Sequence, residues 1–242
     1  MIKLVVSGAH GRMGNTIAKL ALKDPKTFKI TALLEHKNHP KLKEKIEGLT
    51  VSSDNNSIKG SDVLIEFTLP EPTLENLAAC VRHNVKMVIG TTGFTPEQQE
   101  KIVAAAEKIP IVYSTNMSIG VNVLFKLIEM AGKNLKGIQD ISIGETHHIH
   151  KKDSPSGTAK TMKNVADQNA SIQARFDEDK IKREGEVIGY HEITFETEFD
   201  TLKIIHNAKD RGMFASGALE AAKWIQYKKN GLYHMKDVLG LK

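Results

Sequence analysis

The chain has 242 residues, of which 40% are hydrophobic and 26% charged, and its formal net charge is +5 at pH 7. This composition is typical of a globular protein with one large or two small domains. No apolar run reaches the roughly 20 residues of a membrane-spanning helix, and the N-terminus enters a strand-like pattern at once, which argues against a secretory signal. The single cysteine, Cys80, excludes an intramolecular disulfide and fits a reducing compartment. We therefore expect a cytoplasmic protein without a membrane partner.

The positive charge is modest and spread along the chain. Lysines do not form a stripe interleaved with aromatic residues, which make up only 5% of the sequence. A nucleic-acid partner is therefore not indicated. A mild positive field would instead help to gather small anionic molecules.

The first motif is a glycine-rich turn between a strand and a helix. Residues 2–6 predict a short buried strand, residues 8–14 read Gly-Ala-His-Gly-Arg-Met-Gly, and a helical pattern follows at 15–22. This is the context of a dinucleotide-binding turn, in which glycines let a pyrophosphate approach the start of the helix. The spacing G-x-x-G-x-x-G differs from the usual G-x-G-x-x-G, so the motif alone is also compatible with a plain glycine turn.

A second strand separates these two interpretations. Residues 30–34 predict a buried strand that ends at Glu35, roughly 20 residues past the last glycine, where a ribose-binding carboxylate is expected. His36 and Lys37 follow and would soften the repulsion between Glu35 and a 2′-phosphate. We therefore expect nucleotide binding, with both NADH and NADPH accepted.

Strands and helices continue to alternate through the first half of the chain. Strands are predicted at 62–67, 86–89 and 109–113, with helices at 73–83 and from Thr95 onward. Such alternation predicts an α/β fold with a Rossmann-like, doubly wound parallel sheet. Ligands bind beyond the carboxyl ends of the strands in such sheets, and Gly90-Thr91-Thr92 and Ser114-Thr115-Asn116-Met117 follow two of the predicted strands.

After Met117-Ser118 the pattern changes, and we expect a second, smaller α+β domain. Predicted helices lie at 121–134 and 158–169, a strand at 138–144, and two antiparallel strands at 192–199 and 202–205 around a turn at Asp200. A final helix is expected at 212–229.

The segment 145–158 has the greatest concentration of reactive side chains. It reads Glu-Thr-His-His-Ile-His-Lys-Lys-Asp-Ser-Pro-Ser-Gly-Thr. His147 and Lys151 are candidate proton donors of different pKa. Ser156-Gly157-Thr158 can open a helix, where free backbone N–H groups and a hydroxyl receive an anion such as a carboxylate. This combination indicates a site for a small acidic substrate.

A solvated loop or a metal site would also explain a histidine-rich run. The metal interpretation is weak because His147, His148 and His150 lack the i, i+4 spacing of a helical zinc motif, and neighbouring lysines would repel a cation. We therefore expect no metal.

Several segments together resemble the 4-hydroxy-tetrahydrodipicolinate reductases, or dihydrodipicolinate reductases, of bacterial lysine and diaminopimelate biosynthesis. The matching stretches are residues 8–14, 90–93, 116–122, 145–158 and 214–218. The resemblance implies a dinucleotide-binding domain over residues 1–117, rejoined by 212–242, and a substrate-binding and oligomerisation domain over 118–211. It further implies a homotetramer that transfers hydride from NADH or NADPH to a small, dianionic cyclic imine, with loss of water.

Carried over by position, the resemblance assigns proton handling to His147 and Lys151. Substrate binding falls on the residues that start the helix, together with a neighbouring histidine: His148, Ser156, Gly157 and Thr158. Cofactor binding falls on the glycine turn and on the strand-end segments: Gly8, Ala9, His10, Gly11, Arg12, Met13, Glu35, His36, Gly90, Thr91, Thr92, Ser114, Thr115, Asn116 and Met117.

The chain departs from the family pattern in two places. Residues 171–192 are shorter than usual and lack a second glycine-rich arginine turn, and His36 stands where many relatives place an arginine. Two other interpretations stay open, namely an oxidoreductase acting on another small acid and a non-catalytic NAD(P)H-sensing protein. The latter would need a module that reads DNA or protein, and the sequence shows none.

Overall fold

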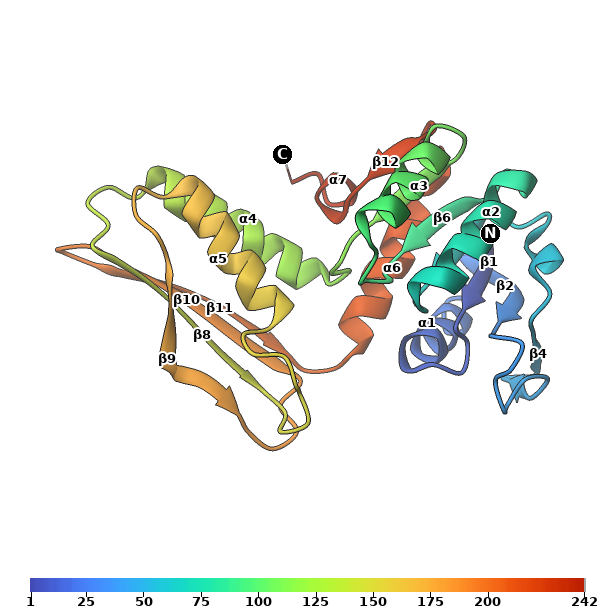
Figure 1. The fold of residues 1–242 in the computed structure, drawn as a ribbon, viewed down its shortest axis with the longest axis horizontal. Helices are drawn as coiled ribbons and strands as arrows, with labels where there is room; N and C mark the ends of the chain where they lie inside the picture. Colours follow the sequence, from blue (N-terminus) through green and yellow to red (C-terminus); the bar gives the residue numbers. More distant parts are fainter. Residues whose placement is uncertain (242) are drawn as a thin grey trace. The chain divides into compact units, whose positions relative to one another are not determined.

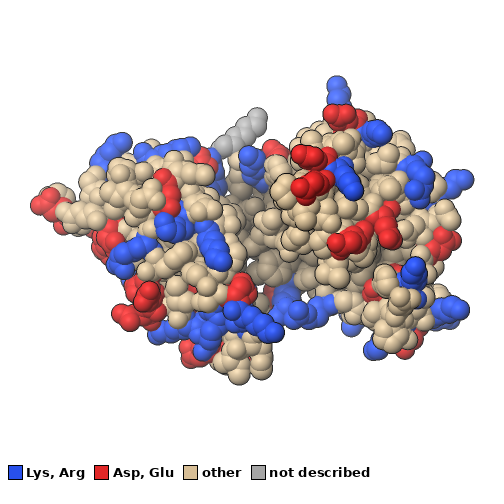
Figure 2. Space-filling model, in the orientation of Figure 1, with Lys and Arg blue, Asp and Glu red and all other residues tan. Residues whose placement is uncertain are grey.

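The computed structural model describes residues 1–241 and divides the chain into two compact units. Unit 1 consists of Met1–Ile119 together with the segment from Gly212 onward, and unit 2 consists of Gly120–Arg211 (Figure 1). Within the described residues, none of the helices combines the length and the apolarity that crossing a bilayer requires. Acidic and basic side chains are interspersed over the face shown in Figure 2.

Unit 1 is built on an eight-stranded sheet with the order β12-β7-β6-β5-β1-β2-β4-β3. The strands are β1 (Ile2–Ser7), β2 (Phe28–Leu34), β3 (Lys45–Ile46), β4 (Leu49–Ser52), β5 (Val63–Glu66), β6 (Lys86–Ile89), β7 (Pro110–Tyr113) and β12 (Gly231–Tyr233). All pairs are parallel except β3–β4. The predicted doubly wound parallel sheet is therefore confirmed.

Helices cover both faces of this sheet. Ile17 and Ala21 of α1 (Arg12–Leu22) and Ala218 of α6 (Gly212–Trp224) belong to one core cluster. Cys80 of α2 (Pro70–His83) and Ile102 of α3 (Pro96–Ala106) belong to the other. The buried strands read as continuous apolar runs because they have a helix layer on each side.

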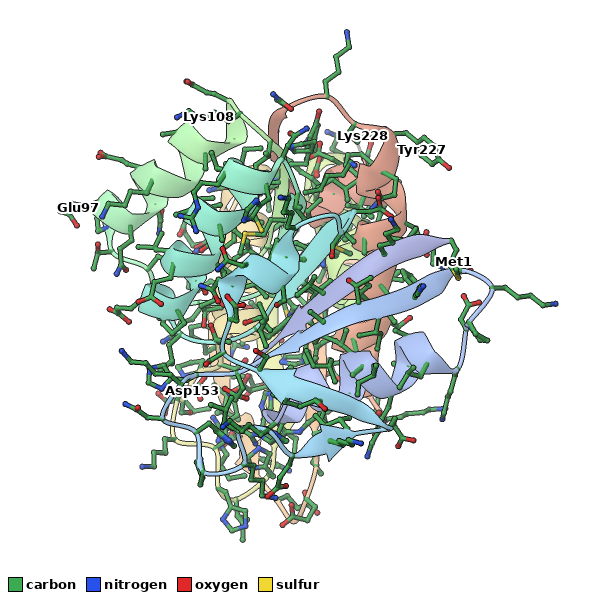
Figure 3. All side chains as sticks on the ribbon, turned by 90° about the vertical axis from the view of Figure 1, so that its right-hand side faces the viewer. Met1, Glu97, Lys108, Asp153, Tyr227 and Lys228 are labelled. Atoms are coloured by element: carbon green, nitrogen blue, oxygen red, sulfur yellow. The ribbon has the colours of Figure 1, made fainter. Side chains whose placement is uncertain are left out.

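The helix ends in unit 1 follow from local sequence. Thr95 and Gln98 form a capping box, in which Thr95 Oγ1 accepts from the Gln98 N–H at 3.3 Å and Gln98 Oε1 accepts from the Thr95 N–H at 2.9 Å. Glu97 in the first turn of α3 and Lys108, two residues past its last residue, are both exposed (Figure 3). The predicted helix 212–229 instead stops at Trp224, and a 3₁₀ turn, η2 (Ile225–Tyr227), precedes β12 and α7 (Met235–Val238).

Unit 2 is a four-stranded sheet with two helices on one face. The strands are β8 (Asp140–His147), β9 (Arg175–Arg183), β10 (Gly189–Glu196) and β11 (Thr201–Ala208), in the order β11-β10-β8-β9. Helices α4 (Ile119–Asn134) and α5 (Gly157–Asn169) pack on it (Figure 1) through residues such as Ile128, Met162 and Phe195. The predicted antiparallel pairing of the last two strands is confirmed.

Two differences from the sequence predictions matter for the site. The first unit 2 strand does not end at Gly144 but continues to His147, so that histidine lies on the sheet. The apparently shortened region contains an edge strand, β9, which pairs with β8. β9 is mostly exposed and charged, with the sequence Arg-Phe-Asp-Glu-Asp-Lys-Ile-Lys-Arg. Charged residues are common on edge strands. They leave little of the alternation of apolar and polar residues from which a strand is predicted.

Candidate functional site

Unit 1 contains a cavity of about 720 Å³ at the carboxyl ends of its parallel strands. Its lining includes residues that follow three neighbouring strands, namely Gly8 and Gly11 after β1, Glu35 and His36 after β2, and Thr68 after β5. This is the edge at which doubly wound sheets bind their ligands. The cavity is large enough for a cofactor-sized ligand.

The glycine turn forms one wall of this cavity, and each glycine has a steric reason. Gly8 has φ of +69°, in the left-handed region that favours glycine. The Gly11 N–H donates to the Gly8 carbonyl at 2.8 Å and closes the turn, and a Cβ on Gly11 would lie only 3.0 Å from that oxygen. A Cβ on Gly14 would lie only 2.1 Å from the Gly8 oxygen. The three glycines therefore bring the turn against the start of α1, where no side chain caps the N–H groups.

Glu35 fastens the end of β2 to this turn. Its Oε2 accepts from the His10 N–H at 3.0 Å and its Oε1 from the His36 N–H at 2.9 Å. The His10 ring stacks on that of His39, with centroids 5.1 Å apart. His39 lines the cavity and was missed by sequence reasoning, because no motif marks it.

The lining of the cavity includes buried polar residues that the sequence also did not reveal. Asn76 of α2 donates to Ser7 Oγ at 3.0 Å and to Glu66 Oε2 at 2.6 Å. Burial raises the pKa of the Glu66 carboxyl. Ser7 and Asn76 both line the cavity.

The other candidate cofactor residues have different surroundings. Ala9 and Met117 are buried in the core, and Thr91 is buried and accepts from the Thr68 N–H at 3.1 Å and the Thr73 hydroxyl at 2.9 Å. Gly90 packs against Phe67, whose ring would lie 2.3 Å from a Cβ there. These contacts shape the strand ends. Eleven of the candidate cofactor residues do not line this cavity, namely Ala9, His10, Arg12, Met13, Gly90, Thr91, Thr92, Ser114, Thr115, Asn116 and Met117.

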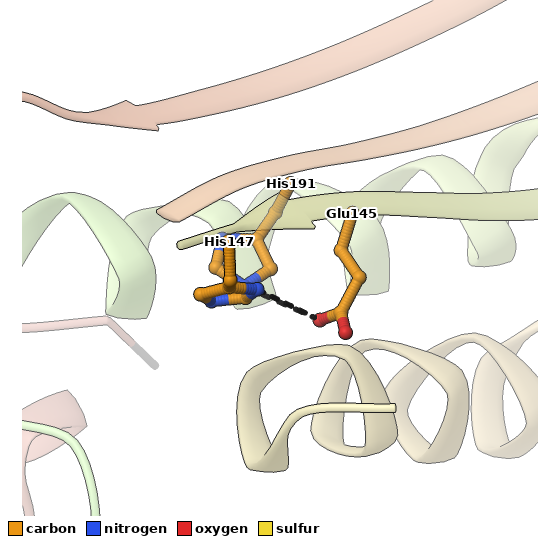
Figure 4. A group of neighbouring side chains, drawn as sticks. All are labelled: Glu145, His147 and His191. Carbon is orange, nitrogen blue, oxygen red and sulfur yellow. Dashed lines mark ion pairs between the residues drawn. The ribbon is translucent and has the colours of Figure 1, made fainter. Parts of the chain in front are cut away.

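Unit 2 gathers Glu145, His147 and His191 into one buried cluster (Figure 4). Glu145 Oε2 lies 3.6 Å from His147 Nδ1 and 3.9 Å from His191 Nε2. The two imidazole rings meet edge to face, with centroids 5.0 Å apart. Glu145 and His147 come from β8, and β10 places His191 directly opposite Glu145.

Burial sets the protonation of these histidines. It lowers the pKa of His191 to about 3, with the neighbouring His147 adding to the effect. Burial also lowers the pKa of His147, while the negative charge of Glu145 raises it and the positive charges of Lys151 and Arg183 lower it further. His191 is therefore neutral near pH 7, and the charge state of His147 depends on its neighbours.

Sequence reasoning singled out neither His191 nor Arg183. Arg183 ends β9, opposite His147 in the β8–β9 pair, and its Nη2 lies 3.2 Å from Glu145 Oε1. Two imidazoles and a carboxylate are a donor set that a divalent metal accepts. Because the guanidinium of Arg183 already neutralises this carboxylate, the cluster has the arrangement of a buried ion pair flanked by two imidazoles.

The loop after β8 carries the second candidate proton donor. Lys151 Nζ donates to both carboxylate oxygens of Asp153, at 2.7 and 2.9 Å, and this hydrogen bonding lowers the pKa of Asp153. His148 is half-buried, and the exposed His150 lies 3.5 Å from Glu186. The ring centroids of His148 and His150 lie 6.1 Å apart, and only His147 of the three histidines joins the buried cluster.

The start of α5 lies next to the same cluster. Ser156 Oγ accepts from the Ala159 N–H at 3.1 Å as an N-cap, while the Ser156 N–H donates to Glu145 Oε1 at 3.0 Å. Gly157, the first residue of α5, is exposed, and Thr158 is half-buried. The N–H of Ser156 is thus occupied by Glu145, and an anion would meet the next residues of the first turn.

Both halves of the chain match models of one known protein family. Residues 2–117 match the family model "Dihydrodipicolinate reductase, N-terminus", and residues 120–239 match "Dihydrodipicolinate reductase, C-terminus". A relative from Syntrophotalea carbinolica, named 4-hydroxy-tetrahydrodipicolinate reductase, is 42% identical over 100% of both chains. One of the same name from Methanoregula boonei is 38% identical over 100% of this chain and 99% of its own.

A solved structure has the same fold. It is titled "Dipicolinate bound Dihydrodipicolinate reductase from Paenisporosarcina sp. TG-14", has a TM-score of 0.82 and 23% sequence identity, and aligns over 97% of each chain. Since the two family models together span nearly the whole chain and full-length relatives are about 40% identical, the chain belongs to the dihydrodipicolinate reductase family.

Proposed function

We propose that the chain catalyses the NADH- or NADPH-dependent reduction of 4-hydroxy-tetrahydrodipicolinate to tetrahydrodipicolinate in lysine and diaminopimelate biosynthesis. One observation supports this most directly. A buried imidazole, His147, ends β8, and the next few residues supply Lys151 and the start of α5. One short segment thus offers two proton donors and a helix N-terminus that can bind an anion. A substrate that carries two negative charges and must be protonated during the reaction requires both.

The proposed binding of the cofactor is based on unit 1. The strand-end cavity and its glycine turn, which a Cβ on Gly14 would disrupt, fit a dinucleotide. Gly8, Gly11 and the start of α1 would bind the pyrophosphate, and Glu35 would bind a ribose hydroxyl. When bound, the nicotinamide supplies a hydride. Segments 90–92 and 114–117 would complete the binding edge.

Acceptance of both nicotinamides follows from the residues around Glu35. A carboxylate favours the ribose hydroxyls of NADH and repels the 2′-phosphate of NADPH. Here both carboxylate oxygens already accept a backbone N–H, and His36 and Lys37 line the same cavity. We therefore propose that the chain uses both cofactors.

The proposed binding and protonation of the substrate are based on unit 2. His148, Ser156, Gly157 and Thr158 would hold the substrate carboxylates through N–H groups, a hydroxyl and an imidazole. Hydride addition to a ring carbon beside an imine leaves electron density that must be protonated, and His147 and Lys151 would supply the protons. The protein contributes positioning and electrostatics. We also propose a cytoplasmic homotetramer, in line with the family resemblance.

The test is oxidation of NADH and of NADPH by the purified protein with freshly generated 4-hydroxy-tetrahydrodipicolinate. Turnover with either cofactor supports the proposal. Absence of turnover with both would contradict it, and turnover of another small acid would point to a different oxidoreductase. The mass of the protein in solution, measured by light scattering, tests the tetramer.

A further inference from the structure

Glu145 contacts four groups from four parts of unit 2, although its side chain is fully buried. Its Oε1 accepts from the Ser156 N–H at 3.0 Å and lies 3.2 Å from Arg183 Nη2. Its Oε2 faces His147 Nδ1 at 3.6 Å and His191 Nε2 at 3.9 Å (Figure 4). The family resemblance gives this residue no role, and a buried carboxylate is costly unless its charge is used.

Arg183 links the carboxylate to the loop that carries Lys151. Besides Glu145, its guanidinium donates to the Asp153 carbonyl at 2.6 Å and to the Lys151 carbonyl at 3.4 Å. The Glu145–Arg183 pair therefore connects the sheet to the backbone on both sides of Lys152. Because Ser156 also donates to Glu145, the loop is held at its far end as well.

The opposite nitrogen of His147 has a different environment. A Cβ built on Gly189 would lie 3.2 Å from His147 Nε2. A glycine at this position leaves space beside that nitrogen, whereas any larger residue would crowd it. His147 thus has a carboxylate at Nδ1 and an uncrowded edge at Nε2.

Resting on the proposed function, we infer that Glu145 is a positioning residue for the proton transfer. The negative charge of its carboxylate, 3.6 Å from Nδ1 and therefore beyond hydrogen-bond distance, favours a proton on that nitrogen, so that Nε2 is the nitrogen that gives the proton to the ring. Through Arg183 the carboxylate also orders the loop that carries Lys151. In the transfer the Nε2–H bond breaks, a bond from that hydrogen to the substrate forms, and the imidazolium becomes a neutral imidazole with its remaining proton on Nδ1. Solvent returns the Nε2 proton before the next turnover.

Glu145→Gln is the direct test, because the amide keeps the size and one acceptor but removes the charge. We expect kcat to fall by about 10- to 100-fold, less than the roughly 10²- to 10⁴-fold effect of a general acid itself, because Glu145 acts through His147. The KM for NADH should be unchanged. Removing a nearby negative charge lowers the pKa of His147, so the alkaline limb of the kcat profile should move to lower pH. Glu145→Asp, which keeps the charge, should return that limb toward its wild-type position.

Glu192→Gln is the matched control. Glu192 is a partly buried carboxylate on β10 that accepts from the Tyr190 hydroxyl at 2.8 Å and lies 3.6 Å from Lys180. Loss of the Glu192 charge should leave kcat and its pH profile unchanged. Wild-type activity and an unshifted profile in Glu145→Gln would overturn the inference, as would an equal loss of kcat in Glu192→Gln.

A measurement without turnover separates this inference from the proposed function. Long-range ¹H–¹⁵N spectra of histidine-labelled protein report which ring nitrogen is protonated, and a His147→Gln variant assigns the signal. We expect neutral His147 to have its proton on Nδ1 in the wild type and a mixture of tautomers in Glu145→Gln. The same tautomer in both would refute the positioning role, whereas the expected shift in a protein that reduces no imine would refute the proposed activity alone.

Discussion

Replacing Gly14 by alanine tests why the glycine turn ends in a third glycine. Gly14 lies in the first turn of α1, where alanine should stabilise the helix by about 1 kcal/mol relative to glycine. The new Cβ, however, would lie 2.1 Å from the Gly8 carbonyl oxygen and 2.6 Å from its carbon. Real Cβ atoms essentially never approach a heavy atom closer than 3.0 Å, so the turn or the helix must move by about 0.9 Å.

Little around the turn can absorb that movement. The Gly11 N–H donates to the same Gly8 oxygen at 2.8 Å, and the Ala9 N–H donates to the Leu34 carbonyl at 3.0 Å. Overpacking of this kind costs about 1–3 kcal/mol, and each disturbed hydrogen bond costs about 1 kcal/mol. We expect a net loss of about 1–3 kcal/mol in the free energy of unfolding, together with weaker nucleotide binding.

Urea unfolding and NADH titration of Gly14→Ala measure the two effects. Lys19→Ala, at an exposed position of the same helix, is the control and should alter neither quantity appreciably. A Gly14→Ala protein that is more stable than the wild type and binds NADH equally well would refute the steric argument. Reduced stability with unchanged NADH affinity would show that the turn does not contact the cofactor.

Three further predictions concern unit 2. His147→Ala and Lys151→Ala should each lower kcat by about 10²-fold or more while NADH affinity holds, since each removes a proton donor; steady-state kinetics and NADH titration check this, and two fully active variants would exclude a catalytic segment. Thr158→Val should raise the KM of the imine substrate more than it lowers kcat, because the hydroxyl would bind a carboxylate away from the transferred hydride; an unchanged KM would contradict this role. Burial lowers the pKa of His191 from 6.5 to about 3, so the unfolded chain binds the extra proton first and stability should fall as pH drops from about 6.5 toward 3. Thermal unfolding of His191→Leu should depend less on pH in that window than the wild type, and parallel curves would refute this explanation.

The Rossmann-like sheet of unit 1 could be predicted from the sequence because its signals are local. Strands buried on both faces appear as short apolar runs, and the turn at residues 8–14 marks the first crossover by its glycines. The antiparallel pair β10–β11 was likewise predicted from alternation around the turn at Asp200. Short or charged strands such as β9 and β12 were missed, since pairing with a neighbour and not their own composition makes them strands.

For the segment 145–158, only part of the candidate site could be predicted from the local sequence. The sequence of this segment alone marked His147 and Lys151 as candidate proton donors and predicted a helix start at Ser156, which the structure confirms. Residue chemistry and capping preferences are properties of short stretches. Only the tertiary structure decided that His191 and Arg183 complete the cluster. Each arrives from another strand, through the register of β10 and β9 against β8. Register depends on contacts between residues far apart in the chain, and no local pattern in either strand specifies which residue will face Glu145.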